Sequence, residues 1–236
     1  MITLRAVNVH ICGCHVIAPH ETMPEMAAKI TPIPDGPLVI EEAPPILGDG
    51  GKPIATGGRG ALCRCGASKM KPWCDGSHKA AGFSSAPTDA TLRDQPLRYA
   101  ATTEETRVSI SYTPVLCSHA AECSRLAASV FDPTRDPWIK PDEGSLESIR
   151  DVMAACPSGA LSLSLDDAPH EHTTRGESEI QIEPNGPYRV TNVTLEAPFS
   201  VAGASEKKYV LCRCGQSDNK PFCDGTHHDI AWRDDE

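Results

Sequence analysis

Hydrophobic and polar residues alternate along two separate stretches of the chain, residues 30–40 and 180–195. Each stretch surrounds a turn sequence of similar composition, Pro-Asp-Gly-Pro at 34–37 and Pro-Asn-Gly-Pro at 184–187. Alternation is typical of strands with one buried face, and Pro with Gly and Asx marks the turn between two strands. The pattern therefore predicts a small β-rich unit in each half of the chain.

Between these stretches the pattern changes to that of a mixed module of strands and helices. We expect a strand at 107–113, a short helix near 120–130 and a closing strand at 160–165. A second helix is expected after Ser145, a good N-cap residue, and a Cys-Pro-Ser-Gly sequence ends it. Spacings of three and four place its apolar side chains on one face: Leu146, Ile149, Val152, Met153 and Cys156.

Two polar segments, 101–106 and 166–179, contain few apolar residues and are interpreted as linkers. The fold class expected is α+β, with small β-rich units on both sides of a small α/β module. The expected domains are a poorly ordered tail (1–25), a first β-rich domain (26–100), a middle domain (101–166), a linker (167–179) and a second β-rich domain (180–236).

The composition favours several small cores over one large one. Only 39% of the 236 residues are hydrophobic and 5% aromatic, whereas there are 21 Pro and 18 Gly. Small modules bury too little apolar surface for comfortable stability and commonly need disulfides or metals. Because the 11 cysteines are odd in number and no convincing secretory signal precedes them, metal ligation is favoured over a disulfide scaffold.

Charge and hydropathy exclude two classes of partner. No run approaches the ~18 apolar residues of a membrane span, so no membrane association is expected. A formal charge of −10 leaves no basic stripe for binding DNA or RNA. The first 25 residues make a poor targeting peptide because they hold one Arg and embedded Cys and His, and we expect a cytoplasmic protein.

A 17-residue sequence occurs twice, at 62–78 and 211–227, with 12 identical positions and no gap. Both copies contain the pattern C-x-C-x8-C-x3-H. Residues i and i+2 of an extended segment point to the same side, so the C-x-C pair can hold one metal atom. Asp75 and Asp224 can cap the turn that brings the His over the preceding Cys. The candidate ligands are Cys63, Cys65, Cys74 and His78 in the first copy and Cys212, Cys214, Cys223 and His227 in the second.

Three cysteines and one histidine are also acceptable ligands for a structural zinc ion, although the usual zinc spacing is C-x2-4-C. The motif resembles the CDGSH iron-sulfur domain, whose pattern is matched by the eight candidate ligands and by Ser68, Pro72, Ser217 and Pro221, with Thr226 replacing the Ser of the motif. The resemblance implies a 2Fe-2S cluster in each copy. It also implies that Cys63 and Cys65 bind the inner iron and that Cys74 and His78 bind the outer one. The second copy would do the same.

CDGSH proteins of the mitoNEET type are homodimers built around a β-rich cap. Since two copies lie in one chain here, the resemblance implies an internal pseudo-dimer.

The middle module contains Cys117, Cys123 and a distant Cys156-Pro157. Bacterial ferredoxins use C-x2-C-x2-C with a distant C-P, and Ala120 stands here at the middle position. The segment resembles the divergent single-cluster ferredoxin domain, which implies a small ferredoxin-like fold. Three thiolates suit a 3Fe-4S cluster, or a 4Fe-4S cluster whose fourth iron takes water, hydroxide or His119. The alternative is that three cysteines simply pack in a small module.

One further group of possible ligands, His10, Cys12, Cys14 and His15, lies in the expected tail and has no predictable partners.

The chain has no G-x-G-x-x-G, P-loop or G-x-S-x-G sequence, so an enzyme is not favoured. The leading hypothesis is a soluble electron carrier with three clusters that meets an unidentified redox partner protein. A cluster-transfer or redox- and pH-sensing protein, a zinc-stabilised interaction module and an enzyme subunit are the alternatives.

Overall fold

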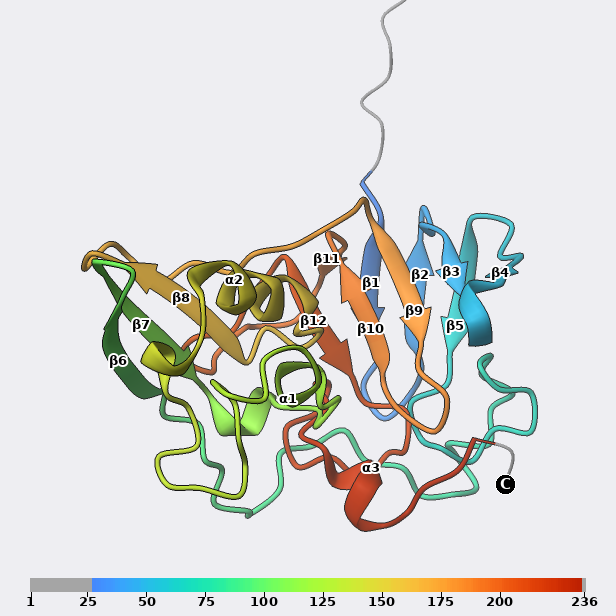
Figure 1. The fold of residues 1–236 in the computed structure, drawn as a ribbon. Coiled ribbons are helices and arrows are strands. Elements are labelled where there is room, and N and C mark those ends of the chain that lie inside the picture. Colours follow the sequence, from blue (N-terminus) through green and yellow to red (C-terminus); the bar gives the residue numbers. More distant parts are fainter. Residues whose placement is uncertain (1–26, 235–236) are drawn as a thin grey trace, which may run out of the picture.

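A computed structural model describes residues 27–234 of the chain, so His10, Cys12, Cys14 and His15 lie outside the described residues. Figure 1 shows strands β1–β5 and β9–β12 gathered on one side and a three-stranded sheet with helices α1 and α2 on the other. We call β1–β5 with the loop after β5 the first repeat, β9–β12 with α3 the second repeat, and β6–β8 with α1 and α2 the middle module. No helix in the described part of the chain is long and apolar enough to cross a membrane.

The two repeats have matching elements because their alternating patterns match. In both, a left-handed residue, Asp35 or Asn185, forms the tight turn between the first two strands. The first repeat comprises β1 (Lys29–Pro32), β2 (Leu38–Glu41), β3 (Ile46–Leu47), the 3-10 turn η1 (Asp49–Gly51), β4 (Pro53–Ile54) and β5 (Arg59–Leu62). The second comprises β9 (Glu179–Ile182), β10 (Tyr188–Thr191), β11 (Thr194–Leu195), β12 (Lys208–Leu211) and α3 (Thr226–Asp229).

The repeats exchange short strands. β3 of the first repeat pairs in parallel with β9 of the second, and β11 of the second pairs in parallel with β1 of the first. The sheet orders are therefore β11-β1-β2-β5 and β12-β10-β9-β3-β4. Each repeat completes the other's sheet.

One hydrophobic core lies between these two sheets and draws its side chains from both repeats. A few short strands bury too little apolar surface to be stable alone, so the shared core explains why the repeats pair. The expected α+β class with small β-rich modules is confirmed. The buried core includes Ile30, Leu38, Ile40 and Leu62 of the first repeat and Ile180, Tyr188, Val190 and Leu211 of the second.

The middle module is an antiparallel sheet, in the order β6-β7-β8, whose inner face packs against α2. Ser145 caps α2 by accepting a hydrogen bond from the Ser148 backbone N–H, as the sequence predicts. The elements are β6 (Leu97–Thr103), β7 (Thr106–Tyr112), η2 (Pro114–Leu116), α1 (Glu122–Leu126), η3 (Pro141–Glu143), α2 (Leu146–Ala155) and β8 (Leu161–Leu165).

One sequence-based interpretation of this module is wrong. The segment 101–106 is not a linker: residues 101–103 complete β6, and Glu104 and Glu105 form the hairpin turn to β7. Its polar composition is that of an edge strand with one face in solvent. The short helix expected near 120–130 is confirmed as the five-residue α1, after which the chain turns to bury Phe131 in the module core.

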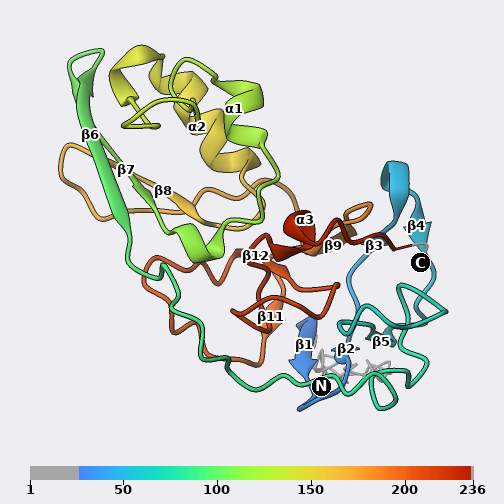
Figure 2. The ribbon, with the colours of Figure 1, turned by 90° about the horizontal axis from the view of Figure 1, so that it is seen from below.

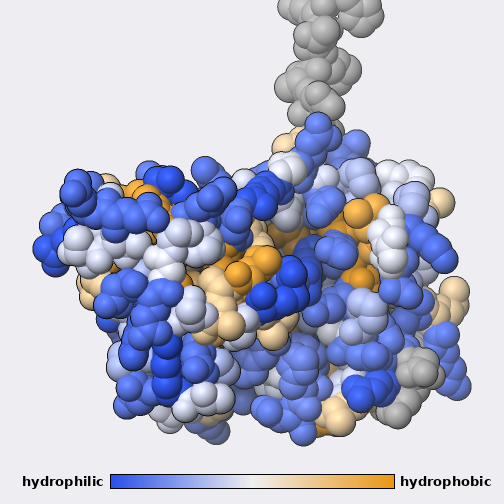
Figure 3. All heavy atoms as spheres, in the orientation of Figure 1, coloured by the Kyte–Doolittle hydropathy of each residue, from blue (hydrophilic) through white to orange (hydrophobic). Residues whose placement is uncertain are grey.

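In Figure 2 the strands β11 and β12 of the second repeat lie between the middle module and the strands of the first repeat. Polar side chains cover most of the face drawn in Figure 3, and apolar ones gather near its centre. The loop after β5 returns to the middle module, where Arg93 O accepts a hydrogen bond from the Val115 N–H (3.2 Å).

Candidate metal centres

The first ligand loop is held by backbone pairing next to β5. The Cys63 N–H donates to Pro72 O (2.8 Å), and the Cys74 N–H donates to Ala61 O (2.8 Å). This pairing folds residues 72–74 back along the end of the strand. It brings the segment that carries Cys74 next to the segment that carries Cys63.

Within that loop the four side chains form two close pairs. Cys63 Sγ lies 3.6 Å from Cys65 Sγ, and Cys74 Sγ lies 3.4 Å from His78 Nδ1. The second repeat reproduces both distances, 3.7 Å between the sulfurs of Cys212 and Cys214 and 3.4 Å from Cys223 to His227.

These pairs have the separation of two ligands on one tetrahedral metal atom. Metal–sulfur bonds of ~2.3 Å and metal–nitrogen bonds of ~2.0 Å give roughly 3.7 Å between two sulfurs and roughly 3.5 Å between sulfur and nitrogen. Within residues 27–234, however, no three His, Cys, Asp or Glu side chains come together as ligands of a single ion do. A structural zinc ion needs four ligands around one point, whereas a binuclear cluster needs two at each metal. The donor sets fit a binuclear iron-sulfur cluster.

Asp75 and Asp224 close the ligand loops, a role broader than the expected cap. Asp75 accepts hydrogen bonds from the backbone N–H of Ser77 and of Lys69, both at 2.9 Å. Asp224 accepts the equivalent bonds from Thr226 and Asp218. The Ser77 hydroxyl, together with these two backbone bonds, holds the pKa of the exposed Asp75 carboxyl well below its usual range.

The motif serines fix the same loops from inside, a role the sequence analysis did not assign. The buried hydroxyl of Ser68 donates to Trp73 O (2.6 Å), and that of Ser217 donates to Phe222 O (2.7 Å). Only their recurrence in both copies pointed to a function.

Tyr188 of the second repeat braces the first ligand loop. Its fully buried hydroxyl donates to Cys63 O (2.7 Å) and lies 3.2 Å from Pro72 O. The matching position in the first repeat is Leu38, which cannot return the contact. The second repeat therefore stabilises the first site.

Tyr188→Phe is expected to destabilise the protein by about 1–2 kcal/mol, because the buried Cys63 carbonyl loses its donor. The first site should lose its visible absorbance at lower urea concentration. Tyr209→Phe is the matched control, since the Tyr209 hydroxyl donates to Val193 O, away from both ligand loops. Equal bleaching of the first site in both variants would contradict this role for Tyr188.

The two sites differ in burial. In the first, Cys65, Cys74 and His78 are half-buried. In the second all four side chains are buried, none more than 5% exposed. Burial lowers the pKa of His227 to about 4, with the neighbouring His228 acting in the same direction.

On acidification the first site is expected to bleach at higher pH than the second. Iron binds the neutral form of imidazole. An ordinary His is protonated below pH ~6.5, whereas His227 stays neutral down to about pH 4. The second site should therefore persist between these two pH values. His78→Cys should remove the early phase of absorbance loss and His227→Cys should leave it unchanged. The pH dependence of visible absorbance tests this, and one phase insensitive to His78→Cys would sink the prediction.

Glycine allows the two C-x-C loops to touch. A Cβ on Gly66 would lie 2.6 Å from Cys214 O, and one on Gly215 would lie 2.7 Å from Cys65 O. Both glycines have positive φ. The backbones of the two metal centres are therefore in direct contact across the pseudo-dimer.

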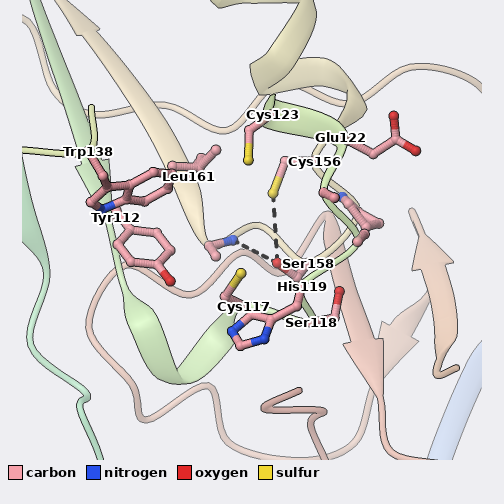
Figure 4. A pocket seen from close by; sticks show the side chains of 14 residues that line it. Tyr112, Cys117, Ser118, His119, Glu122, Cys123, Trp138, Cys156, Ser158 and Leu161 are labelled. Carbon is pink, nitrogen blue, oxygen red and sulfur yellow. Dashed lines mark hydrogen bonds between the residues drawn. The ribbon is translucent and has the colours of Figure 1, made fainter. Parts of the chain in front are cut away.

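The three cysteines of the middle module line a single cavity, into which Figure 4 shows their sulfur atoms directed. Cys117 comes from the loop after β7, Cys123 from α1 and Cys156 from the end of α2. Ala120 also lines the cavity. Burial raises the pKa of Cys117 to about 11. A thiolate in this position needs a positive metal beside it, which fits a cluster with one thiolate on each of three irons.

The middle site abuts the second ligand loop. A Cβ on Gly225 would lie 3.2 Å from Cys117 O and from His119 Nδ1. The His119 ring also stacks on that of His228, with centroids 6.2 Å apart. All eleven candidate ligands of the described chain therefore belong to three neighbouring sites.

Comparison with known proteins agrees with this division. The family described as "Iron-binding zinc finger CDGSH type" matches residues 35–79 and 185–228, and the family described as "Divergent 4Fe-4S mono-cluster" matches residues 103–166. The "Uncharacterized protein YjdI" of Escherichia coli, from strain K12 and from O157:H7, is 34% identical over 55 residues, which are 23% of this chain and 72% of YjdI. The chain belongs to the CDGSH-type iron-sulfur proteins, with a divergent 4Fe-4S mono-cluster domain between its two CDGSH domains.

Proposed function

We propose that this iron-sulfur protein is a one-electron carrier. Each CDGSH site holds a 2Fe-2S cluster, with Cys63 and Cys65 on one iron and Cys74 and His78 on the other. Cys212, Cys214, Cys223 and His227 act in the same way. Cys117, Cys123 and Cys156 hold a 3Fe-4S or 4Fe-4S cluster. Bound clusters of these types accept and release single electrons.

The contact between the three sites is the observation that supports this function. The middle site meets the second loop at Gly225, and the second loop meets the first at Gly66 and Gly215. The buried second site thus lies between two half-exposed sites, because Cys65 and Cys74 of the first and Cys117 and Cys123 of the middle site are only half-buried. Such a row suits electron passage between a buried centre and the surface.

Anaerobic titration with dithionite tests the proposal. With one electron for each cluster, the chain should take up about three electrons. Because the sites are adjacent, the EPR signals of the reduced 2Fe-2S clusters should be broadened by one another. A chain that takes up no electrons would contradict the proposal. An EPR spectrum equal to the sum of the spectra of non-interacting clusters would also contradict it.

A second candidate function is transfer of a cluster to another protein, which the half-exposed first site favours. Incubation with an apo-ferredoxin, followed by visible circular dichroism, separates the two. A donor should pass on only the first cluster, and His78→Cys should slow that transfer. A carrier should keep all three.

A further inference from the structure

The two repeats present the same surface of the ligand loop to different surroundings. At Gly225 a Cβ would meet Cys117 O and His119 of the middle module. At the equivalent Gly76, apart from the glycine itself and its two chain neighbours, no atom of residues 27–234 lies within 4 Å of such a Cβ. The middle module covers this surface on the second repeat, and the described chain leaves it open on the first.

The residues at the equivalent positions 219 and 70 show the same difference between a covered and an open surface. Asn219 is 9% exposed and donates a hydrogen bond to Val115 O of the middle module (3.4 Å). Its counterpart Met70 is 62% exposed. A large apolar side chain therefore stands in solvent where the other repeat makes an interface.

The open surface also differs in charge. Lys69 and Lys79, both exposed, replace Asp218 and His228 of the second repeat. We call Lys69, Met70 and Lys79 the open ligand face. It combines two exposed lysines with an exposed apolar side chain, next to the Asp75 carboxylate, on a chain with a formal charge of −10.

We propose that the open ligand face is the docking surface for an acidic electron-carrier protein. The proposal rests on the proposed function. In the docked complex one electron leaves the reduced carrier as the first site is reduced, and the reverse transfer oxidises the first site. Met70 supplies an adaptable apolar contact, and the lysines steer the partner.

The covered surface indicates what kind of partner fits. The middle module that occupies it is a small iron-sulfur domain, and residues 97–172 contain twelve acidic and six basic residues, a formal charge of −6. The middle module is tethered to the second repeat and needs no long-range steering, in keeping with the absence of lysine at positions 218 and 228 of the ligand loop that it contacts. A diffusing acidic partner does need steering, and the first repeat has lysines at those positions.

The test uses the full cluster-loaded chain and a small acidic plant-type 2Fe-2S ferredoxin as probe. The variant combines Lys69→Asp, Met70→Asn and Lys79→His, which copies the second repeat's own residues. The control combines Lys52→Asp and Lys207→His, an equal change of charge on exposed side chains elsewhere. At low salt, the Kd of the probe should rise about tenfold or more in the variant and by less than about twofold in the control.

Binding of the wild-type chain should weaken as salt rises. If the variant loses visible absorbance, Lys69→Ser with Lys79→Ser replaces it, and a smaller rise in Kd is expected that still exceeds the rise in the control. Equal affinity in variant and control, no binding of the probe, or self-association that the variant abolishes would each overturn the docking proposal. If one of these results is found but the chain still takes up three electrons in the dithionite titration, the proposed carrier function stands. A chain that takes up no electrons contradicts that function, whatever the docking experiment shows.

Discussion

After aerobic purification the protein is expected to show the EPR signal of an oxidised three-iron cluster, and Ala120→Cys is expected to abolish it. An oxidised 3Fe-4S cluster has an odd electron count and is paramagnetic, whereas oxidised 2Fe-2S and resting 4Fe-4S clusters are silent. Only Cys117, Cys123 and Cys156 supply sulfur to the cavity, so a four-iron cluster there has one iron without a thiolate. That iron is the one most easily lost on oxidation.

Ala120 lines the same cavity, so a cysteine there would complete the set of four thiolates. His119→Ala is the control, because the His119 ring also borders the cavity while it stacks on His228. The signal should persist in that variant. A silent spectrum from a fully loaded wild-type sample would rule out the three-iron form and assign His119 or solvent to a fourth iron.

Residues 26–96, the first repeat alone, are expected to form no cluster-loaded monomer. In isolation β1 loses its partner β11, β3 loses β9, and the first ligand loop loses the Tyr188 hydroxyl. A second copy of the fragment can supply the two strands, so the fragment should either dimerise or fail to fold. Light scattering with visible absorbance measures both outcomes, and a stable red monomer would contradict the shared core.

The sequence predicts what repeats or has a clear period. The strands around Asp35 and Asn185 follow from alternation and turn chemistry, and α2 follows from its apolar face and the Ser145 cap. The two ligand loops follow from the duplicated motif, whose four side chains the structure brings together as two pairs in each copy.

Other features depend on contacts between distant residues. β3 and β11 are two residues long, too short to show any period, and each finds its partner in the other repeat. The near-identical motifs also predict similar burial of the two sites. The observed difference in burial arises because the middle module packs against the second ligand loop, at Asn219 and Gly225. The motif sequence alone does not indicate which of the two copies the middle module contacts.

Metal and acid-labile sulfide analysis of the aerobically purified chain tests the central claim, three clusters on one chain, most directly. Two 2Fe-2S clusters and one 3Fe-4S cluster give about seven iron and about eight sulfide ions, and a four-iron middle cluster raises the iron to about eight. Zinc in place of iron, or iron without acid-labile sulfide, would contradict the claim.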